Sequence, residues 1–183
     1  MAFRYMVLKN GWLIFNYGTG LANFRASTGR PGISDPSIEN MGPIPPGWYI
    51  IYPSEISDVY YWNKKENVVN YAKTYAHYVV RNAIQGDWGS YRVKLHPYIF
   101  KYPGRDGHRS DFFLHGGKNI GSAGCIDVGR KDVALFNLIQ KTSTYDGTDN
   151  ILVEVTDTPN KPGWEYLKAN SPIEELQRWW NDL

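Results

Sequence analysis

The sequence of 183 residues has little cysteine, no long apolar run and no strong charge imbalance. Its single cysteine, Cys125, excludes an internal disulfide framework and a multi-thiolate zinc site. No stretch approaches the ~18 consecutive apolar residues of a membrane-spanning helix. The net charge of +2 is too small to indicate a nucleic-acid partner by itself. A single globular domain is therefore expected, since one domain usually has roughly 100–200 residues.

The N-terminal segment MAFRYMVLKNGWLIF lacks a basic stretch followed by ~7–15 apolar residues, the mark of a cleavable signal peptide. We therefore expect synthesis in the cytoplasm without a signal peptide and, if the protein works elsewhere, another export route. Hydrophobic residues make up 42% of the chain and charged residues 21%, which excludes wholesale disorder.

Aromatic side chains are abundant, with 14 Tyr, 7 Trp and 7 Phe, alongside 18 Gly and 11 Pro. Aromatic residues favour strands, and Gly and Pro favour turns, so the expected fold class is mainly β with α (α+β). A hairpin opens the chain, because Tyr5–Leu8 and Trp12–Tyr17 flank Asn10-Gly11, a favoured type I′ turn. Further strands are expected at Phe24–Ser27, Trp48–Tyr52, Tyr91–Leu95, Tyr98–Tyr102 (after a break at His96-Pro97), Phe112–Leu114, Cys125–Val128 and Ile151–Val155.

Helical spacing occurs in three segments. Apolar residues recur every three to four positions between about 63 and 85, which predicts an amphipathic helix inserted in the β domain. A short helix is expected at Asp132–Lys141, with Val133, Phe136 and Ile139 on one face. A capping box, Ser171-Pro172-Ile173-Glu174, opens a C-terminal helix. The expected division is therefore a domain over residues 1–160 and a helical extension over 161–183 that packs on it.

The segment with the clearest chemical pattern runs from His115 to Cys125. His115 ends one expected strand, Cys125 begins another, and the glycine-rich stretch Gly116–Gly124 joins them. We expect these two strands to be antiparallel, which would bring imidazole and thiol together as nucleophilic thiol catalysis requires. Gly124 has no Cβ to block backbone N–H groups from a developing oxyanion. The residues alone leave a second interpretation open, because a lone cysteine is often a small buried hydrophobe and a histidine beside a loop is often merely packed or solvated.

The stretch His115-Gly116 … Ser122-Ala123-Gly124-Cys125-Ile126 resembles the active-site signature of the L,D-transpeptidases of the YkuD type. The lead-in segments Thr28-Gly29 and Ile44–Ile50 and the closing strand Ile151–Val155 are also similar to that domain, over roughly residues 5–155. The resemblance implies a YkuD-like β-sandwich catalytic domain that acts on the stem peptides of peptidoglycan without a cofactor or a metal.

The sequence differs from the common form of this signature in three ways. Cys125 follows His115 by only ten residues, Ala123 stands where the common form has a second histidine, and Asp127 replaces a basic or Asn residue. This compact form is more similar to the L,D-transpeptidase-like effectors of type VI secretion. That subgroup implies an antibacterial toxin acting in the periplasm of target bacteria, with a component of the secretion apparatus and a periplasmic immunity protein as partners.

The resemblance also implies roles for individual residues. Cys125 would attack the diaminopimelate carbonyl that precedes the terminal D-Ala, and His115 would remove the thiol proton and then protonate the leaving amine. Backbone N–H groups of Gly124 and Cys125 would form the oxyanion hole. Hydrolysis of the thioester gives carboxypeptidase activity, and a free D-amino acid gives exchange.

Five further positions are candidates for binding or orienting the substrate. Ser122 either orients the loop or stabilises a turn, and Gly116 and Gly117 shape the loop after the histidine. Arg109 either pairs with a stem-peptide carboxylate or with Asp111 or solvent. Asp127 shares the strand parity of Cys125 and either orients His115 or meets the substrate ammonium.

Two other functions compete with this interpretation. One is a cysteine amidase or endopeptidase of the NlpC/P60 type, which is disfavoured because that class has its histidine far downstream of a cysteine at a helix start. The other is a non-catalytic, aromatic-rich module that binds peptidoglycan. Replacing Cys125 separates them, because only the enzymes lose activity while binding is retained.

Overall fold

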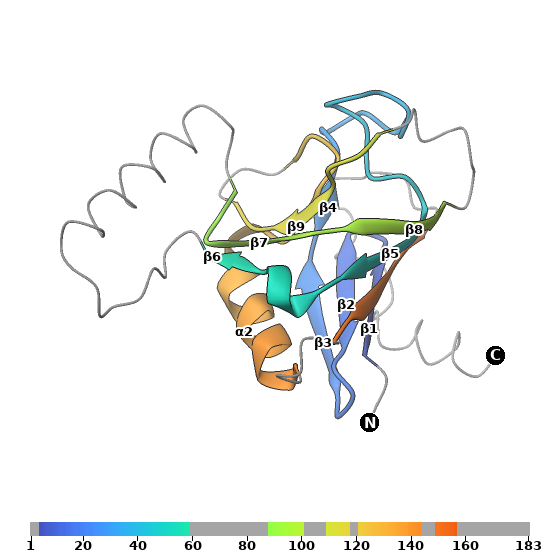
Figure 1. Ribbon diagram of the computed structural model, residues 1–183. Coiled ribbons are helices and arrows are strands. Elements are labelled where there is room, and N and C mark those ends of the chain that lie inside the picture. The colour runs from blue at the N-terminus through green and yellow to red at the C-terminus, as the bar shows by residue number, and fades with distance from the viewer. Residues whose placement is uncertain (1–3, 59–87, 101–108, 118–120, 144–148, 157–183) are drawn as a thin grey trace.

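The structure is a computed structural model that describes residues 4–58, 88–100, 109–117, 121–143 and 149–156. Two segments with expected helices, at about 63–85 and within the extension 161–183, lie outside the described residues. The division into a domain and an extension therefore stays a prediction. Within the described residues, the fold consists of two β-sheets and one α-helix (Figure 1).

One sheet has six strands in the order β3-β2-β1-β11-β5-β8. The central pair, β1 and β11, is parallel, and the other neighbours are antiparallel. The strands are β1 (Tyr5–Lys9), β2 (Trp12–Asn16), β3 (Leu21–Arg25), β5 (Gly47–Ile51), β8 (His96–Phe100) and β11 (Ile151–Val155). The expected hairpin at the start of the chain is confirmed: Asn10 and Gly11 have φ of 51° and 74°, as a type I′ turn requires.

The second sheet has five short strands in the order β4-β10-β9-β7-β6. These strands are β4 (Ser27–Thr28), β6 (Ser57–Asp58), β7 (Tyr91–Lys94), β9 (Phe113–His115) and β10 (Ile126–Asp127). The pair β9 and β10 is parallel, and its neighbours on both sides are antiparallel. The two sheets share one hydrophobic core, in which residues such as Met6 and Phe15 of the first sheet pack with Val93 and Leu114 of the second. The expected fold class, mainly β with some helix in a sandwich, is thus confirmed.

Two strand predictions need correction. The expected strand at Phe24–Ser27 is divided, because β3 ends at Arg25 in one sheet and β4 begins at Ser27 in the other. His96-Pro97 does not separate two strands but opens β8, where Pro97 lies opposite Tyr49. Proline is tolerated there because β8 is an edge strand, so its missing N–H breaks no ladder.

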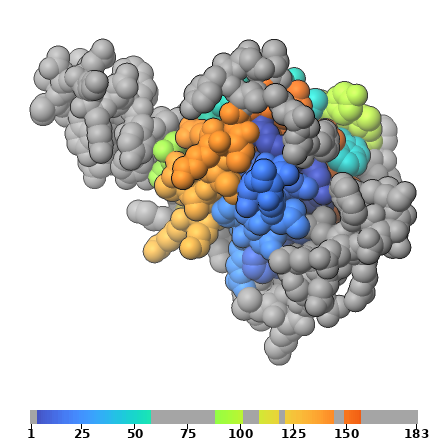
Figure 2. All heavy atoms as spheres, turned by 90° about the horizontal axis from the view of Figure 1, so that it is seen from below, coloured from blue at the N-terminus to red at the C-terminus, as the bar shows by residue number. Residues whose placement is uncertain are grey.

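The described α-helix is α2 (Asp132–Thr142), preceded by the 3-10 turn η2 (Gly129–Lys131); a second 3-10 turn, η1 (Pro53–Glu55), follows β5. The buried face of α2 carries Leu135, Phe136 and Ile139, and Phe136 stacks on Tyr91 of β7 with ring centroids 5.5 Å apart. The expectation that Val133 shares this face is wrong: Val133 is 43% exposed, because the buried positions follow the i, i+3, i+4, i+7 pattern from Asp132. Figure 2 shows α2 beside the N-terminal strands on one face of the molecule.

Candidate active site

The strand that carries His115 and the segment that carries Cys125 are not antiparallel as the sequence analysis expected. β10 runs parallel to β9, with Ile126 opposite Leu114 and Asp127 opposite His115. The chain must therefore return to the end of the sheet at which β9 begins before it enters β10. Ile126 and Leu114 face the core, being fully buried, so His115 and Asp127 project from the opposite face of the sheet.

Cys125 lies immediately before β10, one step back along the same register. It is level with Phe113, whose backbone forms a hydrogen bond with the thiol. Alternation along the strand puts Cys125 on the same face as Asp127 and hence as His115. Strands lie ~4.8 Å apart and rise ~3.3 Å per residue, so the Cα atoms of these diagonal neighbours are about 8 Å apart. An imidazole and a thiol that point toward each other can bridge that distance.

The imidazole of His115 is held from one side by the backbone. Its Nδ1 lies 2.6 Å from the carbonyl oxygen of Gly116. A carbonyl oxygen only accepts hydrogen bonds, so in the neutral ring Nδ1 carries the hydrogen and Nε2 keeps its lone pair. The ring also packs against Trp88, with centroids 4.8 Å apart. His115 is thus buried, oriented and in the tautomer that a general base acting through Nε2 needs.

Cys125 is buried, with 5% of its surface exposed. The pKa of its thiol is raised to about 11; burial is the largest cause, and the negative charges of Asp127 and Asp111 act in the same direction. The Phe113 hydrogen bond and the Arg109 cation oppose this change by lowering the pKa. The thiol is consequently neutral at pH 7.

The raised thiol pKa predicts how Cys125 reacts with iodoacetamide. Only the thiolate reacts, and its fraction rises about tenfold per pH unit below the pKa. We therefore expect the alkylation rate to climb at about that slope from pH 7 to about pH 10, without a plateau. Cys125 is the single cysteine, so protein mass reports it alone, and Cys125→Ala is the blank. A rate already flat near pH 7 would instead reveal a preformed thiolate–imidazolium pair.

The turn before Cys125 is shaped by Ser122 and Gly124. The Ser122 hydroxyl donates to the Cys125 carbonyl at 2.6 Å, and the Ser122 N–H donates to the Gly29 carbonyl at 3.2 Å. Gly124 has a φ of +106°, a conformation that side-chain-bearing residues rarely adopt. A Cβ at Gly124 would also overlap the guanidinium of Arg109. The two Ser122 hydrogen bonds and the close approach of Arg109 to Gly124 hold the backbone immediately before the thiol in one conformation.

Arg109 is buried beside this turn. Its NH1 donates to the carbonyls of Pro36 and Pro43 at 2.7 and 2.8 Å, and its NH2 to those of Gly42 and Ala123 at 3.2 and 3.0 Å. These bonds engage the terminal nitrogens of the guanidinium and join the loop before β5 to the residues before Cys125. Arg109 does not pair with Asp111, whose carboxylate accepts a 2.8 Å hydrogen bond from Lys94.

The glycines after His115 lie against an acidic residue. Asp132, buried at the start of α2, accepts a hydrogen bond from the Ser90 N–H at 2.6 Å, and a Cβ on Gly116 would overlap it. The Gly117 N–H donates to the Gly129 carbonyl at 3.2 Å. Asp127 accepts from the Gly129 N–H at 2.7 Å, so one of its oxygens stabilises the turn into η2.

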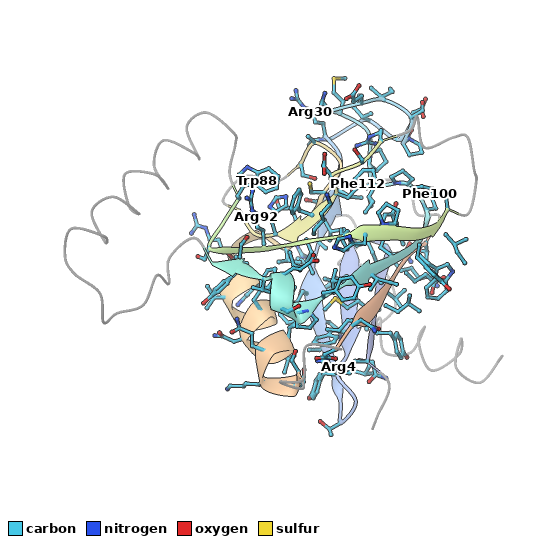
Figure 3. All side chains as sticks on the ribbon, viewed as in Figure 1. Arg4, Arg30, Trp88, Arg92, Phe100 and Phe112 are labelled. Atoms are coloured by element: carbon cyan, nitrogen blue, oxygen red, sulfur yellow. The ribbon has the colours of Figure 1, made fainter. Side chains whose placement is uncertain are left out.

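The sequence analysis did not single out Trp88 or Arg92, although both belong to the face around His115. Arg92 is the cross-strand partner of His115 on β7, and its guanidinium lies over the rings of Trp88 and Phe113 at 5.3 and 5.2 Å (Figure 3). Only the pairing of β7 with β9 brings them there. Among the described residues, no three His, Cys, Asp or Glu side chains are grouped as metal ligands would be.

A β-sandwich that sets a backbone-oriented histidine beside a cysteine defines a candidate cysteine acyl-transfer enzyme. The chain belongs to the YkuD family, described as the L,D-transpeptidase catalytic domain, which matches residues 3–155. This match confirms the expected resemblance to the YkuD family. Among the described residues, no helix has the length and apolar character needed to span a membrane.

A solved structure of Bd1075 from Bdellovibrio bacteriovorus is similar to this chain, with a TM-score of 0.44 and 14% sequence identity. The alignment covers 98% of this chain and 56% of that one, so the chain spans little more than half the length of Bd1075. No curated protein sequence matches the chain.

Proposed function

We propose that this protein is a cysteine-dependent L,D-carboxypeptidase and L,D-transpeptidase that cleaves the diaminopimelate–D-Ala bond of tetrapeptide stems. The observation that carries the proposal is the parallel register of β9 and β10, in which Cys125 and His115 are diagonal neighbours on one face. The contact of His115 Nδ1 with the Gly116 carbonyl supports it, because it places the hydrogen of the neutral ring on Nδ1 and the lone pair on Nε2, the tautomer that a general base acting through Nε2 requires.

In the first half-reaction, His115 Nε2 accepts the thiol proton of Cys125 while the sulfur attacks the diaminopimelate carbonyl carbon. The high thiol pKa makes this transfer concerted with attack, since a free thiolate is scarce at pH 7. The resulting oxyanion is held by the N–H groups of Gly124 and Cys125. When the C–N bond breaks, the imidazolium returns the proton to the amine of D-Ala, and a thioester remains.

In the second half-reaction, the thioester reacts with an acceptor whose proton His115 removes. Water yields a tripeptide stem and the free thiol, which is the carboxypeptidase reaction. The amine of a free D-amino acid yields an exchanged stem, which is the transpeptidase reaction. Both outcomes remove or replace the tetrapeptide donors from which cross-links are made.

The surrounding residues position these groups. The Ser122 hydroxyl donates to the Cys125 carbonyl and so holds the turn that precedes the thiol. Arg109 supports the same turn through the Ala123 carbonyl, and its positive charge favours the thiolate. Asp127, Gly116 and Gly117 set the backbone around His115 and η2.

We further propose that the protein is an antibacterial toxin, delivered by type VI secretion into the periplasm of target cells. The compact spacing from His115 to Cys125, with Ala123 before the cysteine, supports this assignment by its similarity to such effectors. A toxin of this kind needs an immunity protein in the periplasm of the producing cell and a carrier in the secretion apparatus. The proposed toxicity is tested by the survival of bacteria that export this protein to their periplasm.

The proposed reaction is tested by mass spectrometry of purified tetrapeptide stem fragments incubated with the protein. We expect the mass to fall by one alanine residue and free D-Ala to appear, because the thioester is hydrolysed. Adding D-Met to the same reaction is expected to give a stem with D-Met in the fourth position. Cys125→Ala protein, which lacks the sulfur, is the matched blank.

Two other outcomes contradict the proposal. Cleavage between the first and second stem residues, or at the bond between sugar and peptide, would make the protein an amidase or endopeptidase. Unchanged stems together with binding to whole sacculi would make it a binding module and would remove the catalytic roles of Cys125 and His115.

A further inference from the structure

Three adjacent strands of the five-stranded sheet carry polar side chains on one face beside the proposed reaction centre. The strand order is β10-β9-β7, so His115 on β9 lies between the segment of Cys125 and Arg92 on β7. Cys125 is a diagonal neighbour of His115, and Arg92 is its direct cross-strand partner. Directly opposed residues in an antiparallel pair have Cα atoms about 4.5–5.5 Å apart. Arg92 therefore lies on the opposite side of His115 from the strand that follows Cys125.

Arg92 is held in place without a carboxylate partner among the described residues. Its guanidinium carbon lies 5.3 Å from the ring centre of Trp88 and 5.2 Å from that of Phe113, and these two rings meet edge to face at 5.5 Å. Its Nε donates to the Ser57 hydroxyl at 3.3 Å. Figure 3 shows Trp88 and Arg92 together beside β7, next to the strand of His115.

The two neighbouring cations, Lys94 and Arg109, bind groups of the protein itself. Lys94, two residues further along β7 on the same face, pairs with Asp111 at 2.8 Å. Arg109 donates its NH1 and NH2 hydrogens to four backbone carbonyls. Among the described residues, Arg92 contacts two rings and, through Nε, one hydroxyl, and these contacts leave the outer edge of its fork for an anion.

We propose that Arg92 binds the terminal carboxylate of the stem peptide, that of the D-amino acid which leaves, and so makes the enzyme specific for a free C-terminus. This inference rests on the proposed function, because it assigns the leaving residue to the His115 side of the site. The role that the sequence analysis considered for Arg109 thereby belongs to Arg92.

The stereochemistry of the reaction gives the reason. His115 donates its proton to the amine of the departing residue, so that nitrogen lies at the imidazole, and the scissile bond runs from Cys125 toward His115. The carboxyl carbon is two bonds of about 1.5 Å beyond the nitrogen. It is therefore directed away from the carbonyl carbon that Cys125 attacks, toward the side of His115 on which β7 carries Arg92.

The aromatic contacts make Arg92 a suitable partner. Stacking on Trp88 and Phe113 limits the rotamers of a long side chain, so less entropy is lost when the fork binds a carboxylate. The same rings exclude water from one side of the guanidinium, which strengthens a charged hydrogen bond. A carboxylate also matches the planar fork in a bidentate manner, whereas an amide offers a single acceptor without charge.

The test compares two tetrapeptide stems, one with a free terminal carboxylate and one with a terminal carboxamide, which share the same scissile bond. We expect the unmodified protein to cleave the acid with a kcat/KM about 10–100-fold higher than the amide, the range of a charged hydrogen bond. Arg92→Gln is expected to bring the two substrates within about twofold of each other, mainly through a higher KM for the acid. Lys94→Gln, which removes a cation from the same face of β7, is expected to keep the preference.

The alternatives are distinguishable. Release of D-Ala from the acid and of D-alaninamide from the amide at equal rates by the unmodified protein, or a preference that survives in Arg92→Gln, overturns the role of Arg92 and leaves the proposed function standing. No release from either stem overturns the proposed function and this inference with it. Arg92→Lys, which keeps the charge but not the fork, is expected to recover part of the preference, and it provides a second variant if Arg92→Gln folds poorly.

Discussion

Cys125→Ser is expected to lower the rate of D-Ala release by at least ~10³-fold while leaving the fold intact. A hydroxyl fits the space of the thiol, and the buried environment that raises the thiol pKa to about 11 disfavours an alkoxide even more strongly. Nothing else in the described site offers a comparable nucleophile beside His115. The measurement is the initial rate of D-Ala release from tetrapeptide stems, with circular dichroism to compare the folds.

Ser122→Ala is the matched control, because it removes an oxygen three residues from Cys125 without touching the sulfur. We expect it to retain a measurable fraction of the rate. In bacteria that export the chain to the periplasm, survival is expected to fall with the unmodified protein and to recover fully with Cys125→Ser. A serine variant that keeps more than a tenth of the rate would exclude the thioester route, and a lethal one would exclude the enzymatic basis of toxicity.

Gly124→Ala is expected to destabilise the fold and to abolish turnover together. The positive φ of +106° at Gly124 alone costs an alanine about 1–2 kcal/mol. The added Cβ would also overlap the Arg109 guanidinium, which is tied to four carbonyls and has little room to retreat. We therefore expect a loss of more than about 2 kcal/mol in the free energy of unfolding, measured by urea denaturation.

Gly32→Ala separates the cost of the positive φ from the cost of the overlap with Arg109. Gly32 has a φ of +82°, and a Cβ there would meet no atom within 4 Å. It should therefore lose only the backbone contribution of about 1–2 kcal/mol and keep its activity. Equal losses of stability in the two variants would show that the contact between Arg109 and the turn before Cys125 contributes nothing.

Local patterns in the sequence determined much of the fold. Asn10-Gly11 specifies its own hairpin, because both residues tolerate positive φ, and the aromatic and β-branched run ending at Ile51 forms β5 as expected. The candidate pair was also readable, since the glycine-rich stretch between His115 and Cys125 is local in sequence. Each of these features depends on neighbours within a few residues, which is the range over which backbone propensity acts.

Only the tertiary structure decided how those parts meet. The parallel register of β9 and β10 depends on where the connecting loop can cross, and nothing in the sequence of two short strands specifies it. For Arg109 the sequence left open a substrate carboxylate, Asp111 or solvent as partner, yet it binds carbonyls from residues 36–43, far away in the chain. Trp88 and Arg92 reach His115 because β7 pairs with β9. The sequence by itself therefore determined which groups are candidates for the chemistry, whereas strand pairing over long separations decided which of them share one face.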